Sequence, residues 1–315
     1  MKVAGSKREF IRGLHNLRSD HCGSVVTIGS FDGVHLGHQA ILKQVCEQSR
    51  KLNLPSTVMI FEPQPHEFFA AEKAPARLMR LKEKVLALFN EGINRVCCLP
   101  FNHKLSQQPA DEFIQQILVR GLGTRYLVVG DDFRFGVGRA GSYSDLQQAG
   151  ADYGFTVTDT ESLMVDEQRV SSTRIRQLLE DNEFAQAAEL LGKPYTISGR
   201  VVKGNQLGRE LGAPTANVHL HRYRSPLSGV FAVFVRLSGG HLVEGVANVG
   251  VRPTLGGLKK PLLEVHLFNH DSDLYHQNIV VEFKAKLREE QRFETLERLK
   301  EQIQLDIQQA QQFFN

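Results

Sequence analysis

The sequence predicts an α/β fold class: an N-terminal doubly wound parallel-sheet (Rossmann-like) domain, then a domain of antiparallel strands that ends in a helix. Three observations support this prediction. The chain has 315 residues, about twice the usual length of one domain. In its first half, short apolar runs alternate with stretches of helical periodicity, which is typical of a mostly parallel sheet covered by helices. After about residue 185, strand-like runs follow one another without a long helical pattern between them.

The first domain is expected to alternate strands and helices along its whole length. In chain order these are strand 25–31, helix 40–52, strand 57–61, helix 78–92 ending at Gly92, strand RVCCLPF, a helix over ADEFIQQILVRGL, and strand YLVVGDDF. Ligands of such sheets bind at the carboxyl ends of the strands. We therefore expect the chemistry just after the first and the last of these strands.

The second domain is expected to contain five strand-like runs separated by Gly, Pro, Asn and Asp: TISGRVV, GVFAVFVRL, HLVEGVANVG, LLEVHLF and NIVVEFKAKL. Such runs predict an antiparallel barrel or a sandwich. One helix, RQLLEDNEFAQAAELLG at 176–192, is expected to join the two domains. The chain closes with a helix over about 290–314, whose apolar stripe consists of Phe293, Leu296, Leu299, Ile303, Ile307, Ala310 and Phe314.

Composition argues against several classes of function. The formal net charge of +3 is close to neutral, so neither nucleic acid nor a membrane surface is expected as a partner. No window of 18 consecutive apolar residues predicts a membrane span, and MKVAGSKREFIRGLH lacks the features of a secretory signal. The four cysteines lack the spacing of a zinc site, which favours buried thiols in a reducing cytoplasm. We therefore expect a soluble cytoplasmic protein.

Residues 27–38, TIGSFDGVHLGH, run from the end of a strand into a helix. The glycines of this loop would let backbone approach a ligand closely, and the free N–H groups at a helix start attract phosphate. His35 and His38 are three residues apart, so they can face the same phosphate if the helix begins near Gly37. A cationic or hydrogen-bonding imidazole there would stabilise charge in a transition state at phosphorus.

Two histidines near a turn can also be incidental. A zinc site is a poorer interpretation, because the HExxH spacing of metalloproteases and its glutamate are missing. The whole string, however, resembles the signature of the HxGH nucleotidyltransferase superfamily. Its members transfer a nucleotidyl group from a nucleoside triphosphate by direct attack on the α-phosphate.

Three further segments, FEPQPHEFF at 61–69, LVVGDDFRFGVG at 127–138 and RVSSTRIR at 169–176, extend this resemblance. Taken alone, RVSSTRIR predicts an ordinary helix capped by Ser171 or Ser172. Together the segments resemble the FMN adenylyltransferase module of bacterial FAD synthetases, over about Val25 to Leu179. Relatives often carry histidine at the position of Gln64, so Gln64 receives no catalytic role.

The resemblance implies roles for individual residues of the first domain. His35 and His38 are the implied catalytic groups, and Asp131 and Phe133 the implied flavin contacts. The implied contacts to ATP and its phosphates are Gly29, Phe31, Asp32, Gly33, Gly37, Arg169, Ser172, Thr173 and Arg176.

A second candidate site lies in GRVVKGNQLGRELGAPTAN at 199–217. Its glycines Gly204, Gly208 and Gly212 could wrap the phosphates of a nucleotide. Thr215 and Asn217 are two apart, so in an extended segment both point the same way and could hold Mg²⁺ through oxygen atoms. Taken alone, either half of the string would by default be a Gly-rich hairpin with a capping threonine, and the chain has no Walker loop.

In LLEVHLF, Leu263, Val265 and Leu267 face one way while Glu264 and His266 face the other. A carboxylate on the open face of a strand is usually only solvated. This run and the PTAN string nevertheless resemble the riboflavin kinase module over about 193–310, which implies a six-stranded antiparallel β-barrel. The resemblance implies Glu264 as the general base on the ribityl 5′-hydroxyl, with Thr215 and Asn217 binding the metal–nucleotide. Relatives often have glycine where His276 stands, which leaves the conformation of that turn open.

The two modules in this order resemble the bifunctional bacterial riboflavin kinase/FAD synthetase family. The resemblance implies that residues 188–315 convert riboflavin and ATP to FMN, and that residues 1–187 convert FMN and ATP to FAD and pyrophosphate. Mg²⁺ is expected in both steps, and riboflavin, FMN and ATP are the expected partners. Another phosphate ester as acceptor, such as phosphopantetheine, and a flavin-binding protein without turnover are the alternatives. The sequence does not predict the oligomeric state.

Overall fold

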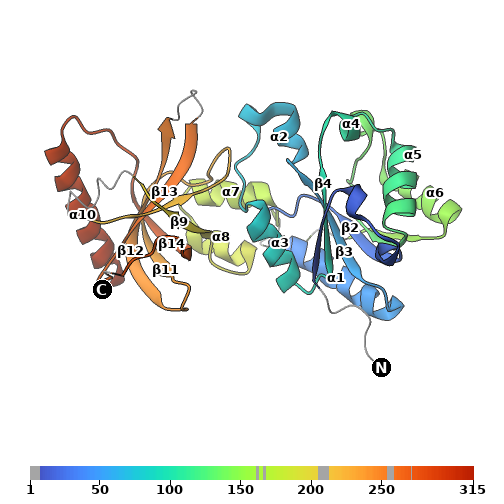
Figure 1. Ribbon diagram of the computed structural model, residues 1–315, viewed down its shortest axis with the longest axis horizontal. Helices are drawn as coiled ribbons and strands as arrows, with labels where there is room; N and C mark the ends of the chain where they lie inside the picture. Colours follow the sequence, from blue (N-terminus) through green and yellow to red (C-terminus); the bar gives the residue numbers. More distant parts are fainter. Residues whose placement is uncertain (1–7, 161–162, 166–167, 205–212, 254–258, 271) are drawn as a thin grey trace. The chain divides into compact units, whose positions relative to one another are not determined.

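The computed structural model describes residues 8–160, 163–165, 168–204, 213–253, 259–270 and 272–315. These residues form two units (Figure 1). The first unit comprises residues up to Pro75 together with Leu81–Ser171, and the second comprises Ala76–Arg80 with Ser172–Asn315. Each unit has its own sheet and its own core, and each is described by itself below.

The first unit is built on a six-stranded sheet in which every pairing is parallel, with the strand order β1-β4-β3-β2-β5-β6. The strands are β1 (Glu9–Arg12), β2 (Ser24–Ile28), β3 (Ser56–Glu62), β4 (Arg95–Pro100), β5 (Thr124–Val128) and β6 (Thr156–Thr158). From β2 the chain proceeds to β3 and β4, then crosses back to β5 on the other side of β2. The sheet therefore changes winding direction between β2 and β5, which is where ligands of doubly wound sheets bind.

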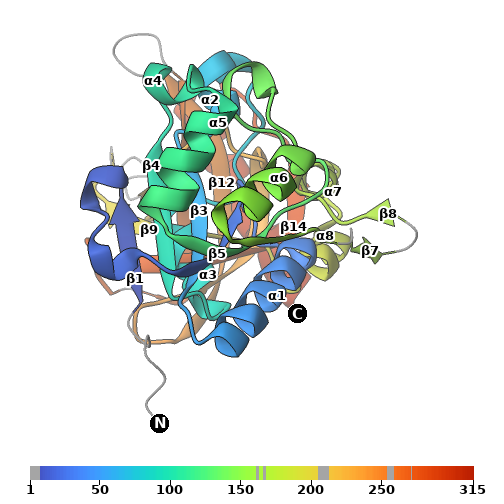
Figure 2. The same ribbon diagram turned by 90° about the vertical axis from the view of Figure 1, so that its right-hand side faces the viewer.

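Helices cover both faces of this sheet, as the change in direction requires. They are α1 (Leu36–Leu52), α2 (Pro65–Ala70), α3 (Leu81–Asn90), α4 (His103–Ser106), α5 (Ala110–Phe113) with the π-helical continuation Ile114–Gly121, and α6 (Tyr143–Tyr153). Figure 2 shows α5 and α6 side by side on one face. Their residues Ile117 and Leu146 pack in one cluster with Val26 and Leu127 of the sheet. The parallel α/β class predicted from the sequence is confirmed.

The predicted connecting helix at 176–192 is wrong as a single element. A short hairpin of β7 (Met164–Val165) and β8 (Gln168–Arg169) is followed by two helices, α7 (Ser172–Glu180) and α8 (Phe184–Leu191). Asn182 between them adopts a left-handed backbone conformation with φ 67°. Asparagine tolerates this conformation, which ends an α-helix even where the apolar periodicity continues.

The second unit is a closed barrel of six antiparallel strands in the order β10-β13-β12-β11-β14-β9. The strands are β9 (Thr196–Val202), β10 (Ala216–His219), β11 (Gly229–Arg236), β12 (Leu242–Pro253), β13 (Lys259–Leu267) and β14 (Asn278–Arg288). Leu263 and Val265 point into the core and have no exposed surface, so the predicted alternation along β13 is confirmed. The five predicted runs are strands, whereas β10 was missed because four residues are too few to display a period.

The C-terminal helix α10 (Leu296–Phe314) packs on the outer face of the barrel. Ala310 is completely buried, in one cluster with Val230 and Val246 of the barrel. The predicted stripe is wrong at its beginning, because Phe293 precedes the helix and Leu296 is 56% exposed. Thr295 instead caps the helix by accepting a hydrogen bond from the backbone N–H of Arg298, which fixes the start beyond Phe293.

A buried ion pair joins α10 to β14. The Arg288 guanidinium donates two hydrogen bonds of 2.7 Å to the Asp306 carboxylate, whose side chain is only 6% exposed. Among the described residues, no helix is both long and apolar enough to cross a lipid bilayer.

Candidate active sites

The first candidate site lies where β2 ends and α1 begins. His35 caps the helix: its Nδ1 accepts a hydrogen bond from the backbone N–H of His38 at 3.3 Å. The two imidazole rings stack with centroids 3.6 Å apart and planes inclined by 19°. The helix begins at Leu36, before the apolar periodicity at 40–52 and next to the start near Gly37 that the site required, and this start brings the two histidines together as their spacing suggested.

The loop before the helix is held by an unusual backbone. Phe31, Gly33 and Val34 all have positive φ, of 46°, 91° and 43°. Only glycine adopts this conformation without strain, so Phe31 and Val34 store strain of the kind that clusters at functional sites. Phe31, Asp32 and Val34 are all at most 2% exposed, and this burial holds the loop in place.

Two of the predicted glycines, Gly29 and Gly37, are required because a side chain would not fit there, not because of a positive φ. A Cβ on Gly29 would lie 3.0 Å from the Phe31 ring, and one on Gly37 would lie 3.2 Å from the His35 ring. A side chain at Gly29 would therefore press on the Phe31 ring, and a side chain at Gly37 would press on the His35 ring that caps the helix. The glycine pattern that suggested a phosphate loop thus also permits the histidine pair.

His38 is neutral in this site. Burial lowers its pKa well below the ordinary value of 6.5, and His35 and the buried Lys84 lower it further. Its Nδ1 is buried and has no hydrogen-bond partner. Of the two options expected from the sequence, a cationic and a hydrogen-bonding imidazole, the pKa favours the hydrogen-bonding form.

The segment after β5 lies across the switch point from this loop. Asp131 and Asp132 are exposed and Phe133 is half-buried, stacked on Phe135 with ring centroids 5.7 Å apart. Arg169 forms an exposed ion pair of 3.2 Å with Asp132. The predicted residues of this segment therefore occupy the carboxyl end of the strand next to β2, as expected.

Sequence reasoning missed a cluster of four phenylalanines at the carboxyl ends of β3 and β4. The rings of Phe61, Phe68 and Phe69 each lie 5.4–5.7 Å from that of Phe101, edge to face. Phe69 is 66% exposed and Phe68 is 37% exposed, so the cluster presents apolar ring surface to solvent. The signal was present in FEPQPHEFF, where two adjacent aromatics follow a short strand and cannot both face the core.

Gln64 and the predicted residues that follow Arg169 in RVSSTRIR lie at the beginnings of helices. Gln64 caps α2, with its backbone N–H donating to Glu67 at 3.0 Å. Ser172, Thr173 and Arg176 lie in the first turns of α7, which groups with the second unit. The Arg176 guanidinium donates to the backbone carbonyl of Ala76.

The second candidate site is a row of polar side chains across three neighbouring strands of the barrel. Asn217 on β10 stands directly opposite Glu264 on β13, and Glu264 stands directly opposite Asn248 on β12. All three lie on the outer face, because their neighbours along each strand are buried in the core. The Oδ1 atoms of Asn217 and Asn248 are buried and have no hydrogen-bond partner. Glu264 was predicted; the second asparagine was not.

Gly204 and Thr215 border this row. A Cβ on Gly204 would lie 2.4–2.6 Å from the side-chain amide of Asn217, so only glycine lets the backbone cover that amide. Asn217 donates from Nδ2 to the carbonyl of Thr215 at 3.3 Å. Gly208 and Gly212, which were also predicted, lie outside the described residues.

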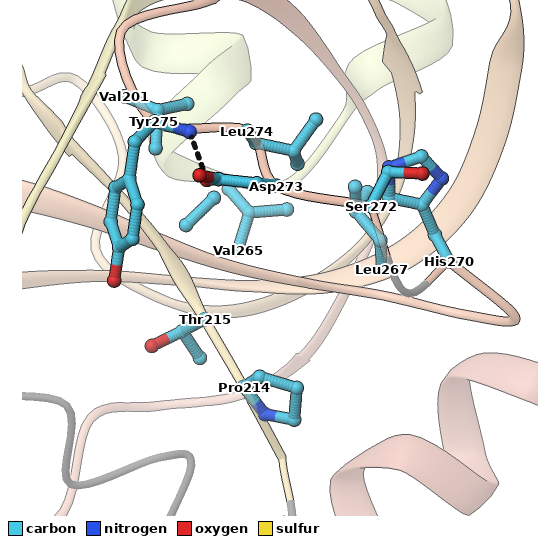
Figure 3. A pocket seen from close by; sticks show the side chains of 11 residues that line it. Val201, Pro214, Thr215, Val265, Leu267, His270, Ser272, Asp273, Leu274 and Tyr275 are labelled. Carbon is cyan, nitrogen blue, oxygen red and sulfur yellow. Dashed lines mark hydrogen bonds between the residues drawn. The ribbon is translucent and has the colours of Figure 1, made fainter.

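A pocket of about 430 Å³ opens beside Thr215 (Figure 3). Val201, Val265 and Leu267 supply apolar lining, and Asp273 and Tyr275 supply polar groups. The Asp273 carboxylate accepts a hydrogen bond of 2.8 Å from the backbone N–H of Tyr275, which fixes the turn that closes the pocket.

That turn also contains His276, the position where relatives often have glycine. His276 has φ 66°, a conformation that glycine adopts at no cost. Its backbone N–H donates to Val201 and its carbonyl accepts from Arg200. The turn therefore has the left-handed conformation that glycine favours, and hydrogen bonds on both sides of His276 hold it.

Family models for FAD synthetase and riboflavin kinase match residues 17–174 and 191–314. The bifunctional riboflavin kinase/FMN adenylyltransferase of Pseudomonas fluorescens is 52% identical over 299 residues, 95% of this chain and 96% of that protein. The enzyme of the same name from Escherichia coli is 50% identical, covering 97% of this chain and 98% of its own. A crystal structure described as a macrolide-efflux protein from Streptococcus pneumoniae superimposes with a TM-score of 0.75 at 28% identity, covering 95% of this chain and 97% of that one.

Proposed function

The chain belongs to the bifunctional riboflavin kinase/FMN adenylyltransferase family, and on that premise we propose which residues carry each of its two reactions. The C-terminal module transfers the γ-phosphoryl group of ATP to riboflavin, giving FMN and ADP. The N-terminal module transfers the adenylyl group of a second ATP to FMN, giving FAD and pyrophosphate. The proposal concerns the residues, the metal ion and the boundary between the modules.

In the adenylyltransferase, the loop at 29–37 and the start of α1 bind the phosphates of ATP. The stacked pair of His35 and His38 at a helix N-terminus carries this assignment. A phosphate oxygen of FMN attacks the α-phosphorus, and pyrophosphate leaves. His38, neutral before ATP binds, donates a hydrogen bond to the phosphate oxygens as negative charge grows on them.

The remaining assignments in this module follow the resemblance, and Asp131 and Phe133 also lie just after β5, the strand next to β2. Asp131 and Phe133 contact the flavin, and the exposed face of the phenylalanine cluster offers a further surface on which its ring system can pack. The proposed phosphate contacts in the first unit are Gly29, Phe31, Asp32, Gly33, Gly37 and Arg169. Ser172, Thr173 and Arg176, which lie in α7 of the second unit, are assigned to the phosphates by the resemblance alone. Arginine is suited to this role by its fork of N–H donors.

In the kinase, Glu264 is the general base. It accepts the proton of the ribityl 5′-hydroxyl as that oxygen attacks the γ-phosphorus and ADP leaves. Its position between two buried, unpartnered amide oxygens on the open face of the barrel carries this assignment. Gly204, Gly208 and Gly212 bind the phosphates, and the pocket beside Thr215 takes the nucleoside of ATP.

Mg²⁺ fits the kinase site. The unpartnered Oδ1 of Asn217 and the hydroxyl of neighbouring Thr215 are the hard oxygen donors that this ion prefers. Among the described residues, no cluster of three or more His, Cys, Asp or Glu could hold a metal ion. A magnesium ion carried on nucleotide phosphates needs no such cluster, since it keeps waters and uses one or two protein ligands. When bound, it would neutralise phosphate charge.

We place the functional boundary between the modules at 187/188, which leaves the riboflavin kinase match of 191–314 wholly in the second module. This boundary falls within α8, and the structure groups both α7 and α8 with the barrel. We further propose that the protein acts in the cytoplasm, where ATP is available. The buried free thiols of Cys97 and Cys98 suit a reducing compartment.

The test of these assignments is a time course with riboflavin, ATP and increasing Mg²⁺, in which the flavins are separated by chromatography. For Asn217→Ala we expect the Mg²⁺ concentration that half-saturates FMN formation to rise about tenfold or more. The Mg²⁺ dependence of FAD formation from added FMN, measured on the same sample, should not change. If the half-saturating Mg²⁺ concentration rose equally for both steps, or did not rise for FMN formation, Asn217 would not belong to the kinase metal site.

A further inference from the structure

The row on the barrel contains one polar side chain that the two reactions leave without a role. Asn248 stands opposite Glu264 on the side away from Asn217. Its Oδ1 is buried and unpartnered, although an amide oxygen shielded from water costs free energy unless a donor reaches it. Such an atom at the edge of a binding site is suited to accept a hydrogen bond from a ligand.

The register of the barrel gives the two asparagines different neighbours. On the Asn217 side the row continues to Val202 on β9, near Gly204 and the pocket beside Thr215. On the Asn248 side it continues to Val230, which is buried beneath α10. The proposed nucleotide site therefore lies on one side of Glu264 and Asn248 on the other.

A shared metal ion does not account for both asparagines. They are separated by two strand spacings, roughly 10 Å. Oxygen atoms that bind one Mg²⁺ at about 2.1 Å lie within about 4 Å of each other. With Asn217 assigned to the metal–nucleotide, Asn248 remains on the side from which the acceptor must approach, because the attacking and leaving oxygens of phosphoryl transfer are roughly in line.

We propose that Asn248 is a substrate-binding residue of the kinase, whose Oδ1 accepts a hydrogen bond from a non-reacting hydroxyl of the ribityl chain. This inference rests on the proposed role of Glu264. Directly opposed residues on neighbouring strands have Cβ atoms about 5 Å apart, so one extended polyol can reach both side chains. Glu264 then contacts the reacting hydroxyl, while Asn248 holds the chain in line.

The test combines a change in the enzyme with a change in the substrate. The analogue 7,8-dimethyl-10-(5-hydroxypentyl)isoalloxazine keeps the ring system of riboflavin and the reacting hydroxyl but lacks the other three hydroxyls. For Asn248→Ala we expect the KM for riboflavin to rise about five- to tenfold, with the KM for ATP within about twofold. The preference of the wild-type enzyme for riboflavin over the analogue should shrink by the same factor, because the variant has lost the group that recognises the missing hydroxyls.

Asn248→Asp, which keeps an acceptor oxygen, should bind riboflavin better than the alanine variant, and it gives a second test if the alanine variant does not fold. Glu244→Ala, on the same strand and the same outer face, is the matched control and should leave both KM values unchanged. FMN adenylylation by each variant reports on the integrity of the rest of the chain.

Two failures are distinguishable. If Asn248→Ala lowers kcat equally with riboflavin and the analogue, with no loss of preference, Asn248 supports the fold or Glu264 and the inference is wrong. If Glu264→Gln also leaves FMN formation intact, the kinase centre lies elsewhere and the proposed function fails with it.

Discussion

The two candidate sites are assembled over very different lengths of chain. In the first unit, the phosphate loop and both histidines come from residues 27–38, and the geometry is set by three positive φ angles and a helix cap. In the barrel, Asn217, Asn248 and Glu264 come from three strands and meet only through the register of the sheet. The first site therefore depends on local backbone conformation, and the second depends on the barrel as a whole.

The sharpest separation of the two sites comes from Glu264→Gln. Loss of a general base should lower FMN formation by about 10²–10⁴. Conversion of added FMN to FAD should persist, because the first site contains none of the barrel residues. Both rates are measured on one preparation by chromatography of the flavins. A parallel fall in both activities would show that Glu264 is structural or that the modules are strongly coupled.

The dependence of the second site on the whole barrel can be tested with a substitution outside the row of Asn217, Glu264 and Asn248, in the ion pair between α10 and β14. Asp306→Ala leaves the Arg288 guanidinium without its carboxylate at a largely buried position. Removing one partner of such a pair should lower the free energy of unfolding of the barrel by about 3 kcal/mol. Urea titrations that follow the loss of each activity should show kinase activity failing at lower urea. The shift for adenylylation should be smaller, because only Ser172, Thr173 and Arg176 of its proposed residues lie in the second unit. Coincident shifts would mean that the units unfold together.

The first site is tested by His38→Ala. Loss of the hydrogen bond to the phosphates in the transition state should lower FAD formation from FMN about 10²-fold or more. FMN formation from riboflavin should remain near wild type. An unchanged FAD yield would remove His38 from the site.

The smallest effect concerns pH. The pKa of His38 is lowered on folding, so below about pH 6.5 the unfolded chain binds a proton that the folded chain does not. The free energy of unfolding of the first unit should therefore fall as the pH decreases from about 6.5 to 5, by up to about 1.4 kcal/mol per pH unit from this group. His38→Gln should flatten this part of the profile, measured by urea unfolding at about pH 5, 6 and 7.5. A profile identical to that of the wild type would mean that His38 titrates normally.

The sequence predicted most of the architecture and the local site for the same reason. The apolar periodicity of each element and the string TIGSFDGVHLGH are both contiguous in the sequence, so both can be recognised without knowing the fold. Asn248 was missed because nothing near it in the chain marks it; only the pairing of β12 with β13 brings it beside Glu264. The break at Asn182 was missed because apolar periodicity continues across it, while a single left-handed residue ends the helix.

The row on the barrel also limits how this chain can change length. Its three members share a face because directly paired residues on neighbouring strands point to the same side, whereas successive residues of one strand point to opposite sides. One extra residue within β13 just before Glu264 would, if the pairing upstream were kept, turn the carboxylate into the core and bring Val265 to the surface. Every residue of the motif would still be present in the sequence, yet no base would face the substrate. Insertions are therefore expected to accumulate between strands, and a relative with an odd-length insertion inside β13 should lack kinase activity.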